Sequence, residues 1–246
     1  LTTFKDRMTV LSKIAQKEKE SGWTLLTALL PYNNDIAHST YKMQWRTFET
    51  NTNTTDLWLE VFKTYAAILD LLFELFDDNE EKFAQMLQKV PELPSALRQK
   101  LIDWAYQVYP NVKHEKALAW ETIREILHRH RSCPDTDWAL SEDELAPLED
   151  LYNQLRPQNV IRQFLWLFNE QWPKIPEGIQ YKSYEYEEAE KIFASKRSDA
   201  LTSILAQVDL DEVMALRTQI EAPETLGSTL ASIINDQEEV LQICQC

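Results

Sequence analysis

Glycine is scarce in this sequence, with only 3 glycines among 246 residues. Loops that hold nucleotide phosphates need several glycines, because these let backbone N–H groups approach the ligand closely. Neither common phosphate-binding motif, GxGxxG or GxxxxGK[ST], is present. Tight β-hairpin turns also favour Gly or Asn. The composition therefore excludes the glycine-loop nucleotide folds and argues against a hairpin-rich β protein.

Cysteines and long apolar runs are also few. The 3 cysteines are Cys133, Cys244 and Cys246, and an odd, scattered set does not form a disulfide framework, which favours a reducing cytoplasm. No apolar run approaches the roughly 18 residues needed to span a bilayer, so a membrane partner is not expected. The chain begins at Leu1 rather than Met, and we expect it to be part of a longer polypeptide.

Positive charge is scarce in the second half of the chain. The formal net charge is −15, and residues 133–246 carry 8 Lys or Arg against 22 Asp or Glu. Such a surface repels phosphate and anionic lipid. The main interpretation is a solvated, solubilising surface, and the second is a surface that steers a basic partner.

Apolar residues recur at helical spacing along most of the chain. The clearest run begins after Asp56, and a second apolar face accompanies it, which predicts a central helix packed on two sides. The residues of the first stripe are Trp58, Phe62, Tyr65, Leu69, Leu72 and Phe76.

The expected helices cover nearly the whole sequence, and no segment has a convincing strand pattern. Ser141 and Glu144 form a capping box, Pro157 stands where a first-turn proline belongs, and Asp209 or Asp211 caps a late helix. The expected ranges are 1–20, 23–30, 56–76, 80–90, 95–109, 112–131, 141–155, 157–172, 184–207, 209–220 and 223–244.

These patterns predict an all-α fold. About ten antiparallel helices would form an irregular α-solenoid-like stack or a multi-helix bundle, because short connections make sequential helices antiparallel neighbours. We expect a single helical domain over residues 1–246, with a candidate sub-boundary near 132–141.

His128, His130 and Cys133, which precede Asp135 and Asp137, are the best candidates for a metal site in this sequence. Zinc takes four N or S ligands in tetrahedral geometry. Helix positions two apart point about 200° away from each other, so the two histidines face one ion only if the helix has ended. The plainer interpretation has His130 against the core and His128 in water. We expect no metal and no cofactor.

The connection over residues 31–55 is rich in Asn, Thr and Ser yet carries several large side chains. Trp and Arg are enriched among interface anchors, so this segment is a candidate partner-binding site. The simpler alternative is that Trp45 packs the connection onto the helices. The candidates here are Tyr32, His38, Trp45 and Arg46.

A small basic patch ends the helix expected over 112–131. It could hold a phosphate or an acidic helix, or its cations could pair with neighbouring acids, of which the chain has 40. Arg129 and Arg131 are the candidate partner-binding residues of this patch.

No reaction is indicated by the remaining residues. No serine lies in the G-x-S-x-G nucleophile motif, and paired carboxylates for catalysis need a cleft that separates their pKa values. A solvated helix face accounts equally well for Glu185, Glu187, Glu188 and Glu190. We therefore assign no catalytic residue.

Three stretches together resemble a helical region of very large, mostly uncharacterised bacterial proteins, some of which are similar to signalling ATPases of the STAND type. The resemblance covers most of the chain and implies a sensor or scaffold segment in a bacterial cytoplasm. It supplies no catalytic residue. The stretches are Trp23–Pro31 with Trp45-Arg46, His128–Asp135 with Trp138-Ala139-Leu140, and Trp166-Leu167-Phe168 with Trp172-Pro173 and Pro176-Glu177-Gly178.

The sequence thus favours a non-catalytic helical module that binds protein, including other domains of its parent chain. One alternative is an all-helical metal-dependent hydrolase that uses clustered carboxylates. A second alternative, nucleic-acid binding, would need the basic patch to join the mildly basic N-terminal part of the chain.

Overall fold

The computed structural model describes residues 4–31, 54–112, 116–180 and 186–234. Within these ranges every regular element is a helix, with eleven α-helices and four 3₁₀ helices, so the all-α class is confirmed. The chain divides into two compact units, unit 1 (Leu1–His114) and unit 2 (Glu115–Cys246). The division falls after His114, whereas the sequence placed its candidate boundary near 132–141. None of the described helices is long and apolar enough to cross a lipid bilayer.

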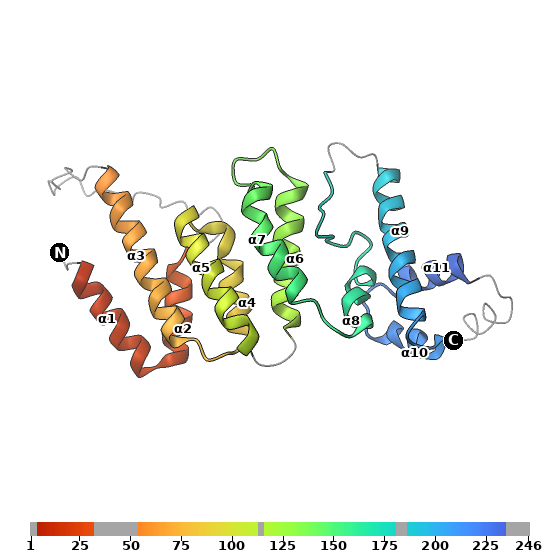
Figure 1. Cartoon of the computed structure of the whole chain (residues 1–246), viewed down its shortest axis with the longest axis horizontal. Coiled ribbons are helices and arrows are strands. Elements are labelled where there is room, and N and C mark those ends of the chain that lie inside the picture. The colour runs from red at the N-terminus through yellow and green to blue at the C-terminus, as the bar shows by residue number, and fades with distance from the viewer. Residues whose placement is uncertain (1–3, 32–53, 113–115, 181–185, 235–246) are drawn as a thin grey trace, which may run out of the picture. The chain divides into compact units, whose positions relative to one another are not determined.

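The described residues of unit 1 form five α-helices, of which α2 and α3 both pack against α1 (Figure 1). Gly22 of α2 allows the close approach to α1, because a Cβ at this position would lie 2.5 Å from the Cα of Ala15. The elements are α1 (Phe4–Lys17), α2 (Lys19–Leu29), α3 (Thr54–Leu75), α4 (Glu80–Gln88), η1 (Val90–Glu92), α5 (Ser95–Val108) and η2 (Tyr109–Asn111).

The core of unit 1 is rich in aromatic rings. Trp104 of α5 stacks on Phe73 with ring centroids 4.8 Å apart and meets Phe76 edge-on at 5.0 Å. These contacts explain why α3 buries its C-terminal half. The first half of α3 differs from the expectation, since Trp58 is 73% exposed and Leu59 is 52% exposed. Apolar periodicity marks a helix face but does not tell how far the neighbouring helices extend along it.

Unit 2 begins with α6 and α7, which lie side by side as a helical hairpin (Figure 1). The long helix α9 follows the short helices α8 and η3 and packs against both of them and against α11. The elements are α6 (Ala117–Ser132), α7 (Glu142–Gln154), α8 (Val160–Phe164), η3 (Leu165–Phe168), α9 (Tyr186–Leu205), α10 (Leu210–Ala215), η4 (Leu216–Thr218) and α11 (Pro223–Ile233).

The segment 157–172 corrects one expectation. In place of one helix starting at Pro157, Asn159 caps α8 by accepting a hydrogen bond from the backbone N–H of Arg162 at 3.1 Å. After five residues the α-helix tightens into η3. This short helical pair buries Val160, Leu167 and Phe168 in the same core as Phe193 of α9.

The predicted caps of two other helices are present. The backbone N–H of Ser141 donates to the carboxylate of Glu144 at 3.0 Å, which is the reciprocal bond of the capping box at the start of α7. Asp209 accepts a hydrogen bond from the backbone N–H of Glu212 at 2.9 Å and so caps α10. Local hydrogen-bonding chemistry fixes both helix starts.

Candidate functional site

Unit 2 contains a cavity of about 290 Å³ where the α6–α7 hairpin meets α8, η3 and α9. Trp120 of α6, Tyr152 of α7 and Trp166 of η3 contribute large rings to its lining. Helix α9 closes another side with Lys196, Asp199, Ala200 and Ser203. We call this cavity the unit 2 pocket.

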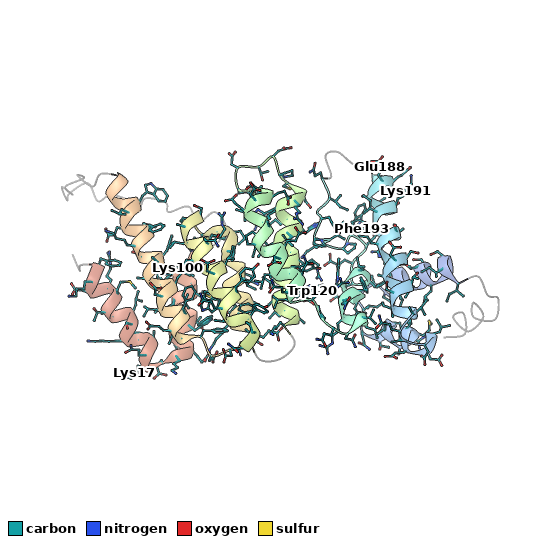
Figure 2. The ribbon with its side chains drawn as sticks, viewed as in Figure 1. Lys17, Lys100, Trp120, Glu188, Lys191 and Phe193 are labelled. Carbon is teal, nitrogen blue, oxygen red and sulfur yellow. The ribbon has the colours of Figure 1, made fainter. Side chains whose placement is uncertain are left out.

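Three aromatic rings and a guanidinium group pack together in and behind the wall of this pocket. The rings of Trp120 and Tyr152 are nearly parallel, with centroids 5.0 Å apart and an angle of 7°. Arg124 lies one turn after Trp120 on α6, so both side chains emerge on the same helix face. Its guanidinium carbon lies 5.4 Å from the Trp120 ring centroid and 4.1 Å from that of Trp166. Figure 2 marks Trp120 on α6.

Two sets of hydrogen bonds fix the position of Trp166. Its indole N–H donates to the backbone carbonyl of Gln163 at 2.8 Å. The guanidinium of Arg197, on α9, donates to the carbonyl oxygens of Leu167, Glu170 and Gln171 at 2.7–2.9 Å. Because these bonds tie η3 and the residues after it to α9, the Trp166 ring is held over Arg124.

Arg124 is buried without a complete set of partners. The residue is only 7% exposed. The Nε and Nη1 atoms of its guanidinium are buried and make no hydrogen bond. Burial lowers the pKa of Arg124 from its ordinary value, yet a guanidinium stays charged in proteins. The two indole faces stabilise the cation, by roughly 0.5–2 kcal/mol for such a contact.

A further buried donor belongs to the same stack. Trp120 is 3% exposed, and its indole Nε1 is buried with no hydrogen-bond acceptor. A buried unsatisfied donor costs about 1–3 kcal/mol. All three of these atoms, the Trp120 Nε1 and the Arg124 Nε and Nη1, are buried N–H donors.

Three of the charged side chains that line the pocket, those of Lys196, Glu177 and Arg156, have partners within the protein. Lys196 forms an ion pair with Glu177 at 2.8 Å. The Nε of Arg156 donates to Gln163 Oε1 at 3.0 Å, and its guanidinium lies over the ring of Phe164. Burial raises the pKa of Tyr152 to about 12, so its phenol stays protonated at neutral pH.

Of the sequence candidates, the two that the structure describes, Arg129 and Arg131, do not line the unit 2 pocket. Tyr32, His38, Trp45 and Arg46 fall outside the residues that the structure describes. Their role as partner-binding residues stays a prediction.

Arg131 is held inside unit 2. Its guanidinium donates to Glu142 at 2.8 Å, to Glu149 at 2.9 Å and to the carbonyl of Pro176 at 3.0 Å. The hydrogen bond to Glu149 is the main cause of the raised pKa of Arg131. Gly178 completes this junction, because its φ of +71° and its lack of a Cβ let the chain pass directly against Arg131.

The second candidate of the patch, Arg129, lies over the Trp138 ring, with its guanidinium carbon 4.8 Å from the ring centroid. Partner binding through these two arginines remains a prediction.

The two histidines of the candidate zinc site, His128 and His130, contact different neighbours. His128 Nδ1 donates to the carbonyl of Ile175 at 3.0 Å, so this side chain does not simply face water. His130 is 2% exposed, and its Nδ1 accepts a hydrogen bond from the backbone N–H of Leu140 at 2.9 Å. Cys133 is an exposed free thiol. Among the described residues, no group of three or more His, Cys, Asp or Glu is placed to hold a metal ion.

Sequence reasoning missed the pocket because its residues come from five separate segments of the chain. One signal was available: the spacing Trp120-x-x-x-Arg124 predicts an indole and a guanidinium on one helix face. Nothing in the sequence tells that Trp166 covers this pair. No protein-family model, no curated protein and no solved structure matches the chain, so the assignment of the unit 2 pocket rests on its geometry alone.

Proposed function

We propose that this chain is a non-catalytic binding module that serves as a sensor or scaffold segment of a larger protein in a bacterial cytoplasm. The observation that carries the proposal is the unit 2 pocket, with stacked aromatic rings and a buried guanidinium in its wall. The resemblance to helical regions of large bacterial signalling proteins gives the setting. The partner is a protein, including other domains of the parent chain, or a ligand that those domains respond to.

The chemistry of the pocket favours recognition over catalysis. A general acid or base must change its protonation state near the working pH. The phenol of Tyr152 does not do so, because its pKa is about 12. Lys196 and Glu177 form an ion pair with each other. Flat rings and buried donors, in contrast, are typical of sites that bind and orient a ligand.

Photo-crosslinking tests the proposal in the intact parent protein. A photoreactive amino acid at Ser203 would stand in the pocket lining, whereas one at Lys191 would stand on the exposed face of the same helix, near Glu188 at its start (Figure 2). We expect a discrete adduct from position 203 that is lost when Trp166→Ala is added. The absence of any adduct at 203, or the same adducts from both positions, would contradict the proposal.

Two simple measurements separate the alternatives. A metal-dependent hydrolase would gain stability from its ion, since a ligand that binds only the folded state raises the melting temperature. We expect no rise with zinc, manganese or magnesium. A nucleic-acid-binding domain would be retained on heparin or DNA at low salt, and we expect this acidic chain to flow through.

A further inference from the structure

We propose that the unit 2 pocket binds a small, uncharged aromatic compound of one or two rings. Ring contacts and the burial of apolar surface hold this ligand, rather than ion pairs. The inference rests on the proposed function, because it names the ligand class of the same site. Of the partners named there, it selects a small ligand to which the other domains of the parent protein respond.

The uncharged polar side chains of the lining use their groups within the protein. Gln163 accepts a hydrogen bond from Arg156 through Oε1 at 3.0 Å and donates one through Nε2 to the carbonyl of Pro157 at 2.7 Å. The hydroxyl of Ser203 donates to the backbone carbonyl of Asp199, one turn earlier on α9, at 2.8 Å. Neither side chain is an orphan that a ligand must satisfy.

The charges of the lining do not favour an ion. Two cations, Arg156 and Lys196, face two anions, Glu177 and Asp199, in number. Lys196 and Glu177 form an ion pair at 2.8 Å, and Arg156, Glu177 and Asp199 are exposed to solvent. An ionised ligand would lose its hydration in the buried part of the pocket without an opposite charge to replace it. The lining therefore favours an uncharged ligand.

The less exposed part of the lining is rich in apolar groups. Trp120, Leu167 and Ala200 are buried. The side chains that are half-buried and line the pocket include Tyr152, Phe164, Trp166 and Pro176. Burial of an apolar ligand against these groups is favourable and needs no specific hydrogen bond.

The rings of the lining favour an aromatic ligand over an aliphatic one. Tyr152 stacks on Trp120 with one ring face, and Trp166 has one face over the guanidinium of Arg124. Because Tyr152 and Trp166 both line the pocket, their remaining surface is available to a ligand. Aromatic rings gain from offset-stacked or edge-to-face partners beyond the area that they bury. The cavity of about 290 Å³ is near the lower end of the range for small-ligand sites, so one or two fused rings fit.

Isothermal titration calorimetry of the full chain with three matched compounds tests the inference at pH 7. The probe is 2-naphthol, which is uncharged at this pH. Decahydro-2-naphthol is its saturated counterpart, and 2-naphthoate is an anionic one. We expect 2-naphthol to bind about fivefold or more tightly than either. No heat of binding with millimolar 2-naphthol, or equally tight binding of either counterpart, would overturn the inference.

A second comparison separates a small ligand from a side chain of a protein. N-acetyltryptophan amide carries an uncharged indole between two peptide groups, as a polypeptide does. We expect it to bind more weakly than 2-naphthol, because the small cavity does not accommodate the peptide groups beside the ring. Tighter binding of N-acetyltryptophan amide would contradict a small-molecule ligand.

Variants locate the binding. Ser203→Leu fills part of the cavity, and we expect the affinity for 2-naphthol to fall about tenfold. Thr202→Leu places the same side chain at the neighbouring, exposed position of α9, outside the lining, and should leave the affinity unchanged. Tyr152→Leu removes one ring, and we expect the preference for 2-naphthol over decahydro-2-naphthol to shrink. Equal effects of Ser203→Leu and Thr202→Leu would contradict the assignment to the pocket.

Circular dichroism checks the folding of each variant, and Ser203→Leu at a half-buried position keeps the test decisive if Tyr152→Leu does not fold. The result is separate from that of the proposed function. A protein-sized adduct at position 203 without binding of 2-naphthol would retain the binding module and refute the ligand class. Binding of 2-naphthol without any adduct would support the ligand class and refute a macromolecular partner.

Discussion

Arg124 and Arg131 lie about two turns apart on α6, and their guanidinium groups contact different kinds of partner. Arg131 has hydrogen-bonded carboxylate partners in Glu142 and Glu149. Arg124 lies against two indole rings and is attracted by Glu121, Glu125 and Glu170 without a hydrogen bond to them. A buried cation with ring contacts but no hydrogen-bonded counter-ion contributes little to stability, because desolvation offsets the gain. A cation with bidentate, charge-assisted bonds contributes more.

The first prediction compares the two arginines by urea denaturation. We expect Arg131→Met to lower the free energy of unfolding by about 1–3 kcal/mol, since it leaves two carboxylates and the Pro176 carbonyl without their donor. Arg124→Met should change it by less than about 1 kcal/mol, because it replaces a buried charge that has no hydrogen-bonded counter-ion with an apolar chain. A larger loss from Arg124→Met than from Arg131→Met would show that Arg124 is mainly structural.

The second prediction concerns pH. Burial is the main cause that lowers the pKa of His128 below 6.5, and nearby Lys174 acts in the same direction, against the hydrogen bond to Ile175. The unfolded chain therefore binds a proton at a higher pH than the folded chain does. The resulting stability is complete above about pH 6.5 and is lost as pH falls through the folded-state value.

Urea denaturation at pH 7.5 and at lower pH values measures this effect. We expect His128→Gln to lose less stability on acidification than the wild-type chain, with Lys191→Met as a control that follows the wild type. An identical pH dependence for His128→Gln and the wild type would refute the assignment to this histidine.

At the scale of single elements, the starts of α7 and α10 were predictable, whereas the start of α8 was not. Ser, Asp and Asn side chains satisfy backbone N–H groups locally, so Asp209 and the Ser141–Glu144 box could be found from the sequence. Helix lengths were less predictable. The apolar stripe of 157–172 continues past α8, yet the chain tightens into η3 there, and α3 leaves Trp58 exposed. Both outcomes depend on which neighbours are present, which periodicity does not encode.

The third prediction tests the cap of α10. Asp209→Ala removes the acceptor for the Glu212 N–H and should lower the free energy of unfolding by about 0.5–2 kcal/mol. Asp209→Ser should restore most of this loss. Asp211→Ala, in the first turn of the same helix, serves as the control with a smaller effect. Equal losses at both positions in chemical denaturation would contradict a specific cap.

At the scale of the whole molecule, the all-α class followed from scarce glycine and helical periodicity, while the site did not. Trp120 and Arg124 share a helix face, but Trp166 and the residues of α9 join them only through tertiary packing. A hydrophobic pattern shows that a ring is buried without showing what it is buried against. The candidates in the 31–55 connection and in the basic patch rest on residue type, which does not show what a side chain packs against either.

The fourth prediction follows from the two compact units. Unit 2 has its own core, built around Phe168, Phe193 and Leu201. A fragment of residues 116–234 should therefore show a helical circular dichroism spectrum and a cooperative thermal transition of its own. A fragment that is unfolded at room temperature would show that unit 2 depends on the rest of the chain.

The most direct test of the account is the ¹H–¹⁵N spectrum of the tryptophan indole groups, assigned with Trp→Phe variants. The 8 tryptophans report from both units. When the partner captured at position 203 is added, the Trp120 and Trp166 resonances should shift, while those of Trp23 and Trp104 in unit 1 should stay in place. Movement of the unit 1 indoles with Trp120 and Trp166 unchanged would contradict recognition through the unit 2 pocket.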